Sequence, residues 1–262
     1  MPFTLSHIAA ALPGYRALSR LHLFTPAVIG TMVPDFHVLL PDAPGRLQTH
    51  SYWPGLLSFS LPVGLACYAL TLWLIKPAIL EVVPNGPYAR LREAEDSGVP
   101  HGPSRWLLAA LAILAGAVTH LIWDGFTHEN AAGVRMFPVL DDFGPHINGH
   151  SLQLYRWLQY GSSVLGLSAV LICLGIWLRH ATPPRRHIPR RLGAVERRCW
   201  LSLYVLIPLI AAGLELWKVQ LSAQALSTLG NKLELIAVAG MRASVLTLLL
   251  LSLIMRARLV AR

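Results

Sequence analysis

The sequence predicts an all-α fold, a polytopic bundle of transmembrane helices with about five spans, preceded by short interfacial helices at the N-terminus. Three observations support this prediction. Hydrophobic residues make up 54% of the 262 residues and charged residues only 13%, as is typical of an integral membrane protein. The apolar residues gather into runs near the length that crosses a bilayer. Tryptophans stand near the ends of most of these runs.

The apolar runs are expected to form the spans of a single membrane domain that covers residues 1–262. All eight tryptophans bracket the first four runs, in pairs whose members are 17 or 20 residues apart. At about 1.5 Å per helical residue, the members of a pair lie about 26–30 Å apart, which matches the hydrocarbon thickness that interfacial tryptophans flank. The expected spans are residues 54–75, 106–126, 158–178, 200–217 and 233–255.

Basic residues are distributed unevenly between the two sides of this bundle. If the N-terminal segment 1–53 and residues 127–157 and 218–232 share one side, that side holds seven Lys and Arg residues. The other side, which includes the basic loop 179–199, holds fourteen. Because cytoplasmic loops carry the excess of Lys and Arg, the second side is expected in the cytoplasm. Segment 1–53 is therefore expected to be non-cytoplasmic and interfacial.

The stretch Leu23–Leu40 competes as a further span. It contains two prolines, Pro26 and Pro34, together with Asp35 and His37. Exposed irregular backbone and charge are not tolerated in lipid, so we interpret this stretch as a short or re-entrant interfacial segment.

The net charge of +9 comes mostly from the loop Arg179–Arg198. Nucleic-acid binding would need a basic face with a reading element, and the sequence contains no such motif. The arginines are expected to fix the topology and to contact anionic lipid headgroups. The three cysteines have no paired spacing, so neither a disulfide framework nor a cysteine-based zinc site is expected.

The sharpest polar cluster stands at the end of the second expected span. His120, Asp124 and His128 are spaced four residues apart, so in a helix they form a stripe about 12 Å long on one face. A carboxylate in a membrane helix is costly unless it is paired. Imidazole and carboxylate are the usual ligands of zinc, manganese and iron. The stripe therefore predicts a site for one or two divalent ions, zinc first and manganese or iron as alternatives.

More histidines and an aspartate belong to the same predicted side. His7, Asp35 and His50 are candidates to complete the site, although a single histidine near a membrane surface is more often an interfacial residue and Pro-Asp is usually a turn or cap. His146 and His150 could form a second metal position or simply line their loop. The role of His37 is equally open.

Four motifs, in this order, resemble a known family. They are MPFTLSH at Met1–His7, GTMVPD at Gly30–Asp35, THS at Thr49–Ser51 and the pattern His120-x-x-x-Asp124-x-x-Thr127. Together they resemble a bacterial family of integral membrane proteins of unknown function, related to the family of membrane-bound metal-dependent hydrolases. The resemblance implies a metal-dependent hydrolase in the bacterial cytoplasmic (inner) membrane. The ligands that it implies are His7, Asp35, His50, His120 and Asp124.

The residues favour hydrolysis by metal-activated water. The sequence has no Gly-x-Ser-x-Gly elbow, so water activated by an ion held at Asp124 is the expected nucleophile, with Glu129 or a spare histidine moving the proton. A site at the end of a membrane helix meets lipid headgroups by lateral diffusion. The expected substrate is therefore a phosphate ester of a membrane lipid or a lipid-linked molecule.

Arg242 lies inside the last expected span and must pair or reach water. It either forms an ion pair with Glu215 or Glu234, or it binds the phosphate of the substrate as a third catalytic residue beside Asp124 and Glu129. Two other classes of protein stay open. One is a transporter of a metal or small anion, and the other is a non-catalytic scaffold with a structural metal.

The charge asymmetry predicts which loops face the cytoplasm. Single cysteines introduced as His187→Cys and Asn148→Cys, in a chain whose native cysteines are replaced by serine, are expected to react differently with an impermeant thiol reagent in intact cells. Position 148 should react at once, and position 187 only after the cells are permeabilised. The reverse pattern would overturn the topology.

Overall fold

The computed structural model describes residues 4–39, 52–84, 87–88, 91, 102–147, 150–180, 192–221 and 229–260. It is helical almost throughout, and five helices are long and apolar enough to cross a membrane. The chain is therefore a multi-pass helical membrane protein, and the expected fold class is confirmed. The five candidate spans are Trp53–Val82, Pro103–Thr127, Leu154–Arg179, Ala194–Lys218 and Leu235–Arg258.

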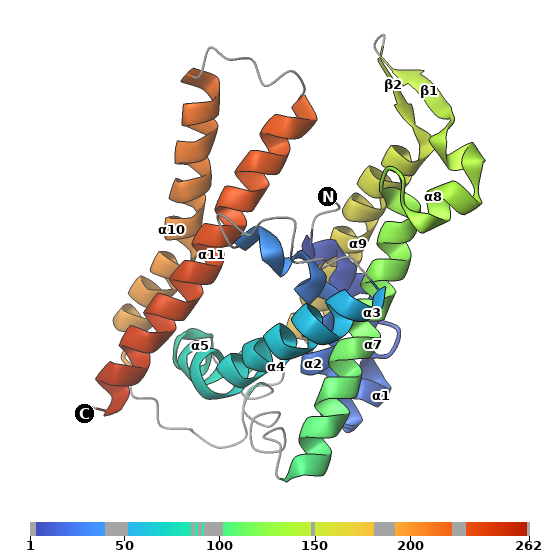
Figure 1. Ribbon diagram of the computed structural model, residues 1–262. Coiled ribbons are helices and arrows are strands. Elements are labelled where there is room, and N and C mark those ends of the chain that lie inside the picture. The colour runs from blue at the N-terminus through green and yellow to red at the C-terminus, as the bar shows by residue number, and fades with distance from the viewer. Residues whose placement is uncertain are drawn as a thin grey trace. The chain divides into compact units, whose positions relative to one another are not determined.

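The chain forms two compact units, which Figure 1 shows together. The first contains Met1–Tyr68 and Pro100–Arg179, and the second contains Ala69–Val99 and His180–Arg262. The candidate site lies in the first unit. The expectation of a single membrane domain stays a prediction.

The first unit begins with short helices, and each ends within a few residues. They are the 3-10 helix η1 (Thr4–Ala11), α1 (Tyr15–Arg20), α2 (Phe24–Met32) and the 3-10 helix η2 (Val33–Leu39). The nine residues of α2 rise only about 14 Å, less than half of the hydrocarbon core. Residues 23–40 contain none of the candidate spans found among the described residues, which agrees with a short, non-spanning segment.

The first span is one continuous helix built from five consecutive pieces. Two of them are π-helical, and Pro62 and Pro77 follow shortly after these π turns. Because proline lacks the N–H that would close an ordinary α-turn, the helix widens locally there. The pieces are α3 (Tyr52–Gly55), η3 (Leu56–Ser60), α4 (Leu61–Leu70), η4 (Thr71–Ile75) and α5 (Lys76–Val82).

Several elements of the first unit, among them η1 and α2, pack against α7 (Pro103–Thr127). After α7 the chain forms α8 (Ala132–Met136) and the 3-10 turn η5 (Pro138–Asp141), and α9 (Leu154–Arg179) then returns alongside α7. The hairpin of β1 (Phe143–Ile147) and β2 (His150–Gln153) is antiparallel, with Phe143 opposite Gln153, Ile147 opposite His150 and an irregularity between Phe143 and His146. A loop was expected here.

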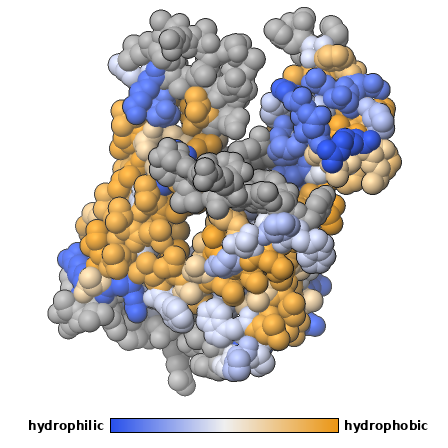
Figure 2. Space-filling model, in the orientation of Figure 1, coloured by the Kyte–Doolittle hydropathy of each residue, from blue (hydrophilic) through white to orange (hydrophobic). Residues whose placement is uncertain are grey.

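The second unit contains the paired helices α10 (Ala194–Leu221) and α11 (Leu229–Val260), which pack along each other. Ala78, Trp200 and Met255 belong to its buried core. Figure 2 shows hydrophobic residues over the visible face of α10 and α11. Hydrophilic residues gather over the end of the first unit that carries α8. Large apolar side chains that stay exposed on long helices are expected where lipid is the solvent.

The close contact between α2 and α7 depends on two glycines that face each other. A Cβ at Gly30 would collide with the main chain of Ile113, and a Cβ at Gly116 would collide with the main-chain oxygen of Ala27 and lie 2.7 Å from the amide nitrogen of Thr31. Backbones can approach this closely only where no side chain intervenes, as is common between membrane helices. The contact brings the carbonyl end of α2 against the last turns of α7.

We expect Gly116→Ala to lower the stability of the protein by about 1–3 kcal/mol, because the added methyl meets main-chain atoms that cannot move aside. Gly175→Ala is the matched control, since a Cβ at Gly175 meets nothing within 4 Å. It should be neutral or stabilising by up to about 1 kcal/mol. Thermal unfolding in detergent measures both, and equal midpoints for the two variants would contradict the packing argument.

Candidate metal centre

The candidate site begins on the last turns of α7. His120 and Asp124 are four residues apart and lie on the same face of the helix, which packs against α2 and η1. His120 is only 1% exposed and Asp124 only 5%. Beneath them Val33, Ala117 and Leu121 form part of a buried apolar cluster. Burying polar side chains at this depth costs several kcal/mol unless each finds a partner.

The orientation of His120 follows from its contact with α2. Its Nδ1 lies 2.8 Å from the main-chain oxygen of Thr31. A carbonyl oxygen can only accept, so Nδ1 carries the proton and donates it. The other ring nitrogen, Nε2, lies 3.1 Å from Asp124 Oδ2 and 3.5 Å from Asp35 Oδ1. A neutral ring with this tautomer would direct its lone pair at two carboxylates, so a cation is required between them, either a second proton or a metal ion.

His7 joins this pair from the 3-10 helix η1. Its ring stacks on the ring of His120 with centroids 3.9 Å apart and planes inclined by 22°. Its Nε2 is buried, lies 3.7 Å from Asp124 Oδ1 and makes no hydrogen bond within the described part of the chain. Burial, reinforced by the neighbouring His120, lowers the pKa of His7 from 6.5 to about 4. His7 is therefore neutral near pH 7 and keeps a lone pair for a ligand.

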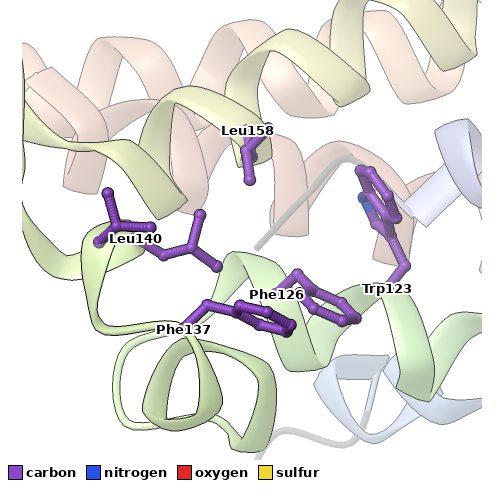
Figure 3. A pocket seen from close by; sticks show the side chains of 6 residues that line it. Trp123, Phe126, Phe137, Leu140 and Leu158 are labelled. Atoms are coloured by element: carbon purple, nitrogen blue, oxygen red, sulfur yellow. The ribbon is translucent and has the colours of Figure 1, made fainter.

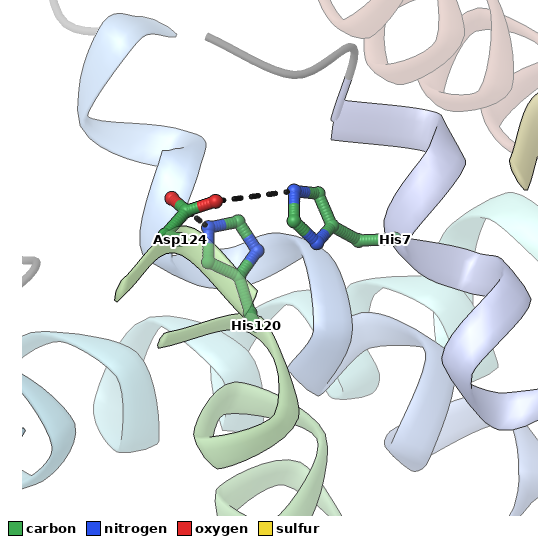
Figure 4. Close-up of side chains that lie close together, drawn as sticks. All are labelled: His7, His120 and Asp124. Atoms are coloured by element: carbon green, nitrogen blue, oxygen red, sulfur yellow. Dashed lines mark ion pairs between the residues drawn. The ribbon is translucent and has the colours of Figure 1, made fainter. Parts of the chain in front are cut away.

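These three side chains offer one donor atom each, and the three atoms lie within 4.8 Å of one another. Figure 4 shows the two imidazoles and the carboxylate turned toward a common point, with His7 contributed by η1 and the other two by α7. Two imidazole nitrogens and a carboxylate oxygen form a familiar ligand set for a divalent transition metal. We call these residues the His7–His120–Asp124 group. It is buried and could hold a metal ion.

Asp35 contacts the group from η2. It is 1% exposed, and its Oδ2 accepts a 2.7 Å hydrogen bond from the hydroxyl of Thr4, while Oδ1 faces His120. The structure brings Asp35 to the predicted place, although the three-donor cluster is complete without it. Its role as a ligand stays a prediction. One carboxylate oxygen is already fixed by Thr4, so the arrangement also suits a residue that orients His120.

His128 lies at the rim of the group. Its Nδ1 is 3.7 Å from Asp124 Oδ1 and 3.2 Å from the main-chain oxygen of the same residue, and about a third of its side chain is exposed. Glu129, the next residue, is exposed. The predicted stripe is therefore present, but its third member differs in burial from the first two. A role for Glu129 in proton transfer stays a prediction.

The other candidates lie elsewhere. His50 is outside the described residues, as are the side chains of His146 and His150, whose backbones form the hairpin. His37 Nδ1 lies 3.0 Å from the main-chain oxygen of Pro34. Arg242 lies on α11 in the second unit, and its role as a phosphate ligand is untested.

Three positioning features were not assigned a role from the sequence. Thr4 holds Asp35, the carbonyl of Thr31 holds His120, and Gly166 lets α9 approach η1, where an added Cβ would lie 2.8 Å from the main-chain oxygen of Ser6. Thr4 and Thr31 stand inside the motifs at Met1–His7 and Gly30–Asp35, which was the available signal. No pattern of spacing could have identified which carbonyl His120 would meet.

The fold and the site together define a multi-pass helical membrane protein with a buried histidine and aspartate group. The chain belongs to the family described as a domain of unknown function, DUF4184, whose model matches residues 1–253. Comparisons with curated proteins and with solved structures gave no match.

The low pKa of His7 predicts a pH dependence for the metal-free protein. Above pH 6.5 the ring is neutral in the folded and unfolded states alike; as the pH falls from about 6.5 toward 4, only the unfolded state binds the proton. Stability should therefore fall over this window, by on the order of 3 kcal/mol in total. His7→Gln should remove most of this slope in thermal unfolding at pH 7 and pH 4. A slope unchanged by the substitution would show that another group is responsible.

Proposed function

We propose that the protein is a membrane-embedded, metal-dependent hydrolase that cleaves a phosphate ester of a lipid or lipid-linked substrate with metal-activated water. The observation that carries the proposal is the convergence of His7, His120 and Asp124 in a buried group at the end of a candidate span. Burying ionisable side chains at this place costs free energy. A bound metal ion would offset that cost by pairing with them and would also make them useful for catalysis.

Zinc is the ion we propose first, with manganese or iron as alternatives. Two imidazoles and one carboxylate leave the fourth position of a tetrahedral zinc ion for water, and such an open position distinguishes catalytic from structural zinc sites. The contact between His120 Nδ1 and the Thr31 carbonyl is the outer contact that metal-bound histidines commonly make. It fixes the tautomer and directs Nε2 at the common point.

A single divalent ion suits the charge of the site better than two. Asp35 and Asp124 together contribute two negative charges, and His7 is neutral. With His120 also neutral, one divalent ion brings the four side chains to net zero. A second ion would leave a net positive charge in a buried environment, where uncompensated charge is costly.

The chain's own residues then have distinct tasks. When bound, the ion would lower the pKa of a coordinated water and polarise a phosphoryl oxygen. His7 Nε2 and the Asp124 carboxylate would bind the ion directly. Asp35 Oδ1, which lies 3.5 Å from His120 Nε2, would keep the His120 ring in its orientation. His128 is the best candidate to exchange the proton with solvent, because it contacts Asp124 and is partly exposed. Glu129 is the alternative proton carrier.

The proposed substrate follows from the place of the group. A site near the end of a membrane helix is reached by molecules that diffuse within the bilayer, and their ester phosphates lie at the depth of the interface. The distribution of basic residues favours a site on the non-cytoplasmic face of a bacterial inner membrane. The arginines of 179–199 would then contact anionic headgroups on the opposite side.

One observation favours a second candidate, a scaffold with a structural metal. All three donors are at most 6% exposed, and structural metal sites are closed to water. The two candidates differ in whether water exchanges at the ion. Phosphate or fluoride binding to the loaded protein, detected by spectroscopy of a cobalt-substituted sample, separates them.

The experiment measures metal content and hydrolysis in the same variants. Wild-type protein purified in detergent is expected to retain about one equivalent of metal by mass spectrometry and to release phosphate or headgroup from vesicles of phosphatidylglycerol and phosphatidylethanolamine. Asp124→Asn and His120→Gln keep the size of the side chain but weaken the ligand set, so both metal and activity should be lost together.

Two further variants give the controls. His37→Gln changes a histidine that is not part of the His7–His120–Asp124 group and whose Nδ1 lies 3.0 Å from the main-chain oxygen of Pro34, and the variant should retain the metal. Arg242→Ala should also retain metal, and a loss of turnover with unchanged melting would identify it as a phosphate ligand, whereas a lower melting temperature would indicate a structural ion pair. Asp124→Asn with full metal content and normal hydrolysis would refute the hydrolase assignment.

A further inference from the structure

A groove lined by large apolar side chains lies at the same end of α7 as the candidate metal centre. It has a volume of about 360 Å³ and is formed where the end of α7, the segment of α8 and η5, and the start of α9 meet. Figure 3 shows its side chains facing a common space. We call it the apolar groove. Its lining residues are Trp123, Phe126, Phe137, Val139, Leu140 and Leu158.

Two side-chain contacts hold the walls of the groove in place. The indole nitrogen of Trp123 donates a 3.1 Å hydrogen bond to the hydroxyl of Ser162, which ties α7 to α9 along one wall. The rings of Phe126 and Phe137 pack with their centroids 6.1 Å apart and line another side of the groove. Every one of these contacts lies within the first unit.

The groove and the metal centre share the last turns of α7. Trp123 directly precedes Asp124, and Phe126 follows it by two residues. Successive helical residues are separated by about 100° around an axis whose helix is about 10 Å wide with its side chains. Trp123 therefore lies about 100° and Phe126 about 200° around the axis from Asp124, so the groove lies largely on the far side of α7 from the Asp124 carboxylate, on the order of one helix diameter away.

Side chains along the groove remain unusually exposed for segments outside the spans. Phe137 is 48% and Val139 is 57% exposed, and neighbouring Met136 is 72% exposed. Leu165 lies about two turns beyond Leu158 on the same face of the candidate span α9 and is 73% exposed, and its neighbour Val164 is 66% exposed. A patch of this kind marks an interaction site. Because this apolar face runs along a candidate membrane span, a hydrocarbon chain is the occupant that it fits.

We infer that the apolar groove binds one hydrocarbon chain of the lipid whose phosphate ester reaches the His7–His120–Asp124 group. The inference rests on the proposed function and narrows its substrate class to lipids with a long aliphatic chain attached near the phosphate. The walls of the groove hold the chain by burial of its methylene groups. The headgroup then projects past Trp123 toward the end of α7.

Photo-crosslinking tests the groove without relying on hydrolysis. The full-length protein is placed in micelles of a nonionic detergent that contain a trace of phosphatidylcholine with a diazirine on its acyl chain. After illumination, mass spectrometry is expected to find label concentrated on residues 136–140. Excess unlabelled lipid should compete with this label, because a groove saturates whereas the bulk lipid around a span does not.

Two substitutions alter the groove, and one serves as a control. Leu158→Trp fills the groove from α9, and Val139→Glu places a charge on its exposed edge outside the spans, where folding is less sensitive. Both should reduce the label on 136–140 severalfold. Leu165→Trp adds the same bulk as Leu158→Trp on the open face of α9 and should leave the label unchanged. Label that is unsaturable, or equal in all variants, overturns the inference, as does a protein partner that covers the segment and keeps lipid away.

Turnover then separates failure of the groove from failure of the proposed function. If the protein hydrolyses lipids, kcat/KM should rise about fourfold for each methylene that the groove buries, and this dependence should flatten in Leu158→Trp. Hydrolysis that is independent of chain length rejects the groove and keeps the enzyme. Saturable label at 136–140 without metal or hydrolysis rejects the enzyme and leaves a lipid-binding groove.

Discussion

The hydrogen bond from His120 Nδ1 to the Thr31 carbonyl is the contact on which the rest of the site depends. It selects one tautomer of a histidine inside the membrane-spanning part of the chain and so decides which nitrogen faces the carboxylates. The bond is possible only because Gly30 and Gly116 allow two helix backbones to meet. Two glycines, which have no side chains, therefore determine where Nε2 of His120 points.

The remaining donors arrive on short 3-10 helices rather than on spans. In a 3-10 helix, residues three apart are eclipsed on the same face, so Thr4 and His7 both project from η1 toward the site. Thr4 then binds Asp35 on η2, while His7 stacks on His120. The long helices provide a rigid support, and the tight N-terminal segments deliver side chains to it. This division explains why the site combines residues so distant in sequence.

Much of this fold was accessible from the sequence, because bilayer thickness imposes a length on apolar runs. The five expected spans correspond to the five candidate spans, and the cost of an isolated carboxylate in lipid pointed to His120 and Asp124. Other features were not accessible. The hairpin was not expected, although the dipeptide Asn148-Gly149 is a strong signal for a hairpin turn. The hydropathy pattern indicates the membrane helices and does not distinguish a hairpin from a loop. The positioning roles of Thr4 and Thr31 depend on helix packing, which residue spacing does not encode.

The sequence placed His128 and His120 on one helical stripe, but the two side chains differ in their exposure to solvent in the structure. His120 lies where no water reaches it, whereas His128 is partly exposed beyond the last turn of α7. Periodicity gives the face of a residue but not its depth, because depth depends on where neighbouring segments end. Here η1 and η2 cover the first two members of the stripe and leave the third open.

Charge balance links this burial to function. Two carboxylates in a site of low polarity cannot remain uncompensated, and a proton on His120 would neutralise only one of them. A divalent ion would neutralise both carboxylates and would be bound by the lone pairs of His7 and His120. The metal-loaded form would therefore carry one more unit of positive charge than the protonated form and would have no net charge. The packing of α2, η1 and α7 already holds the donor atoms close together, so the group has the arrangement that a bound ion would need.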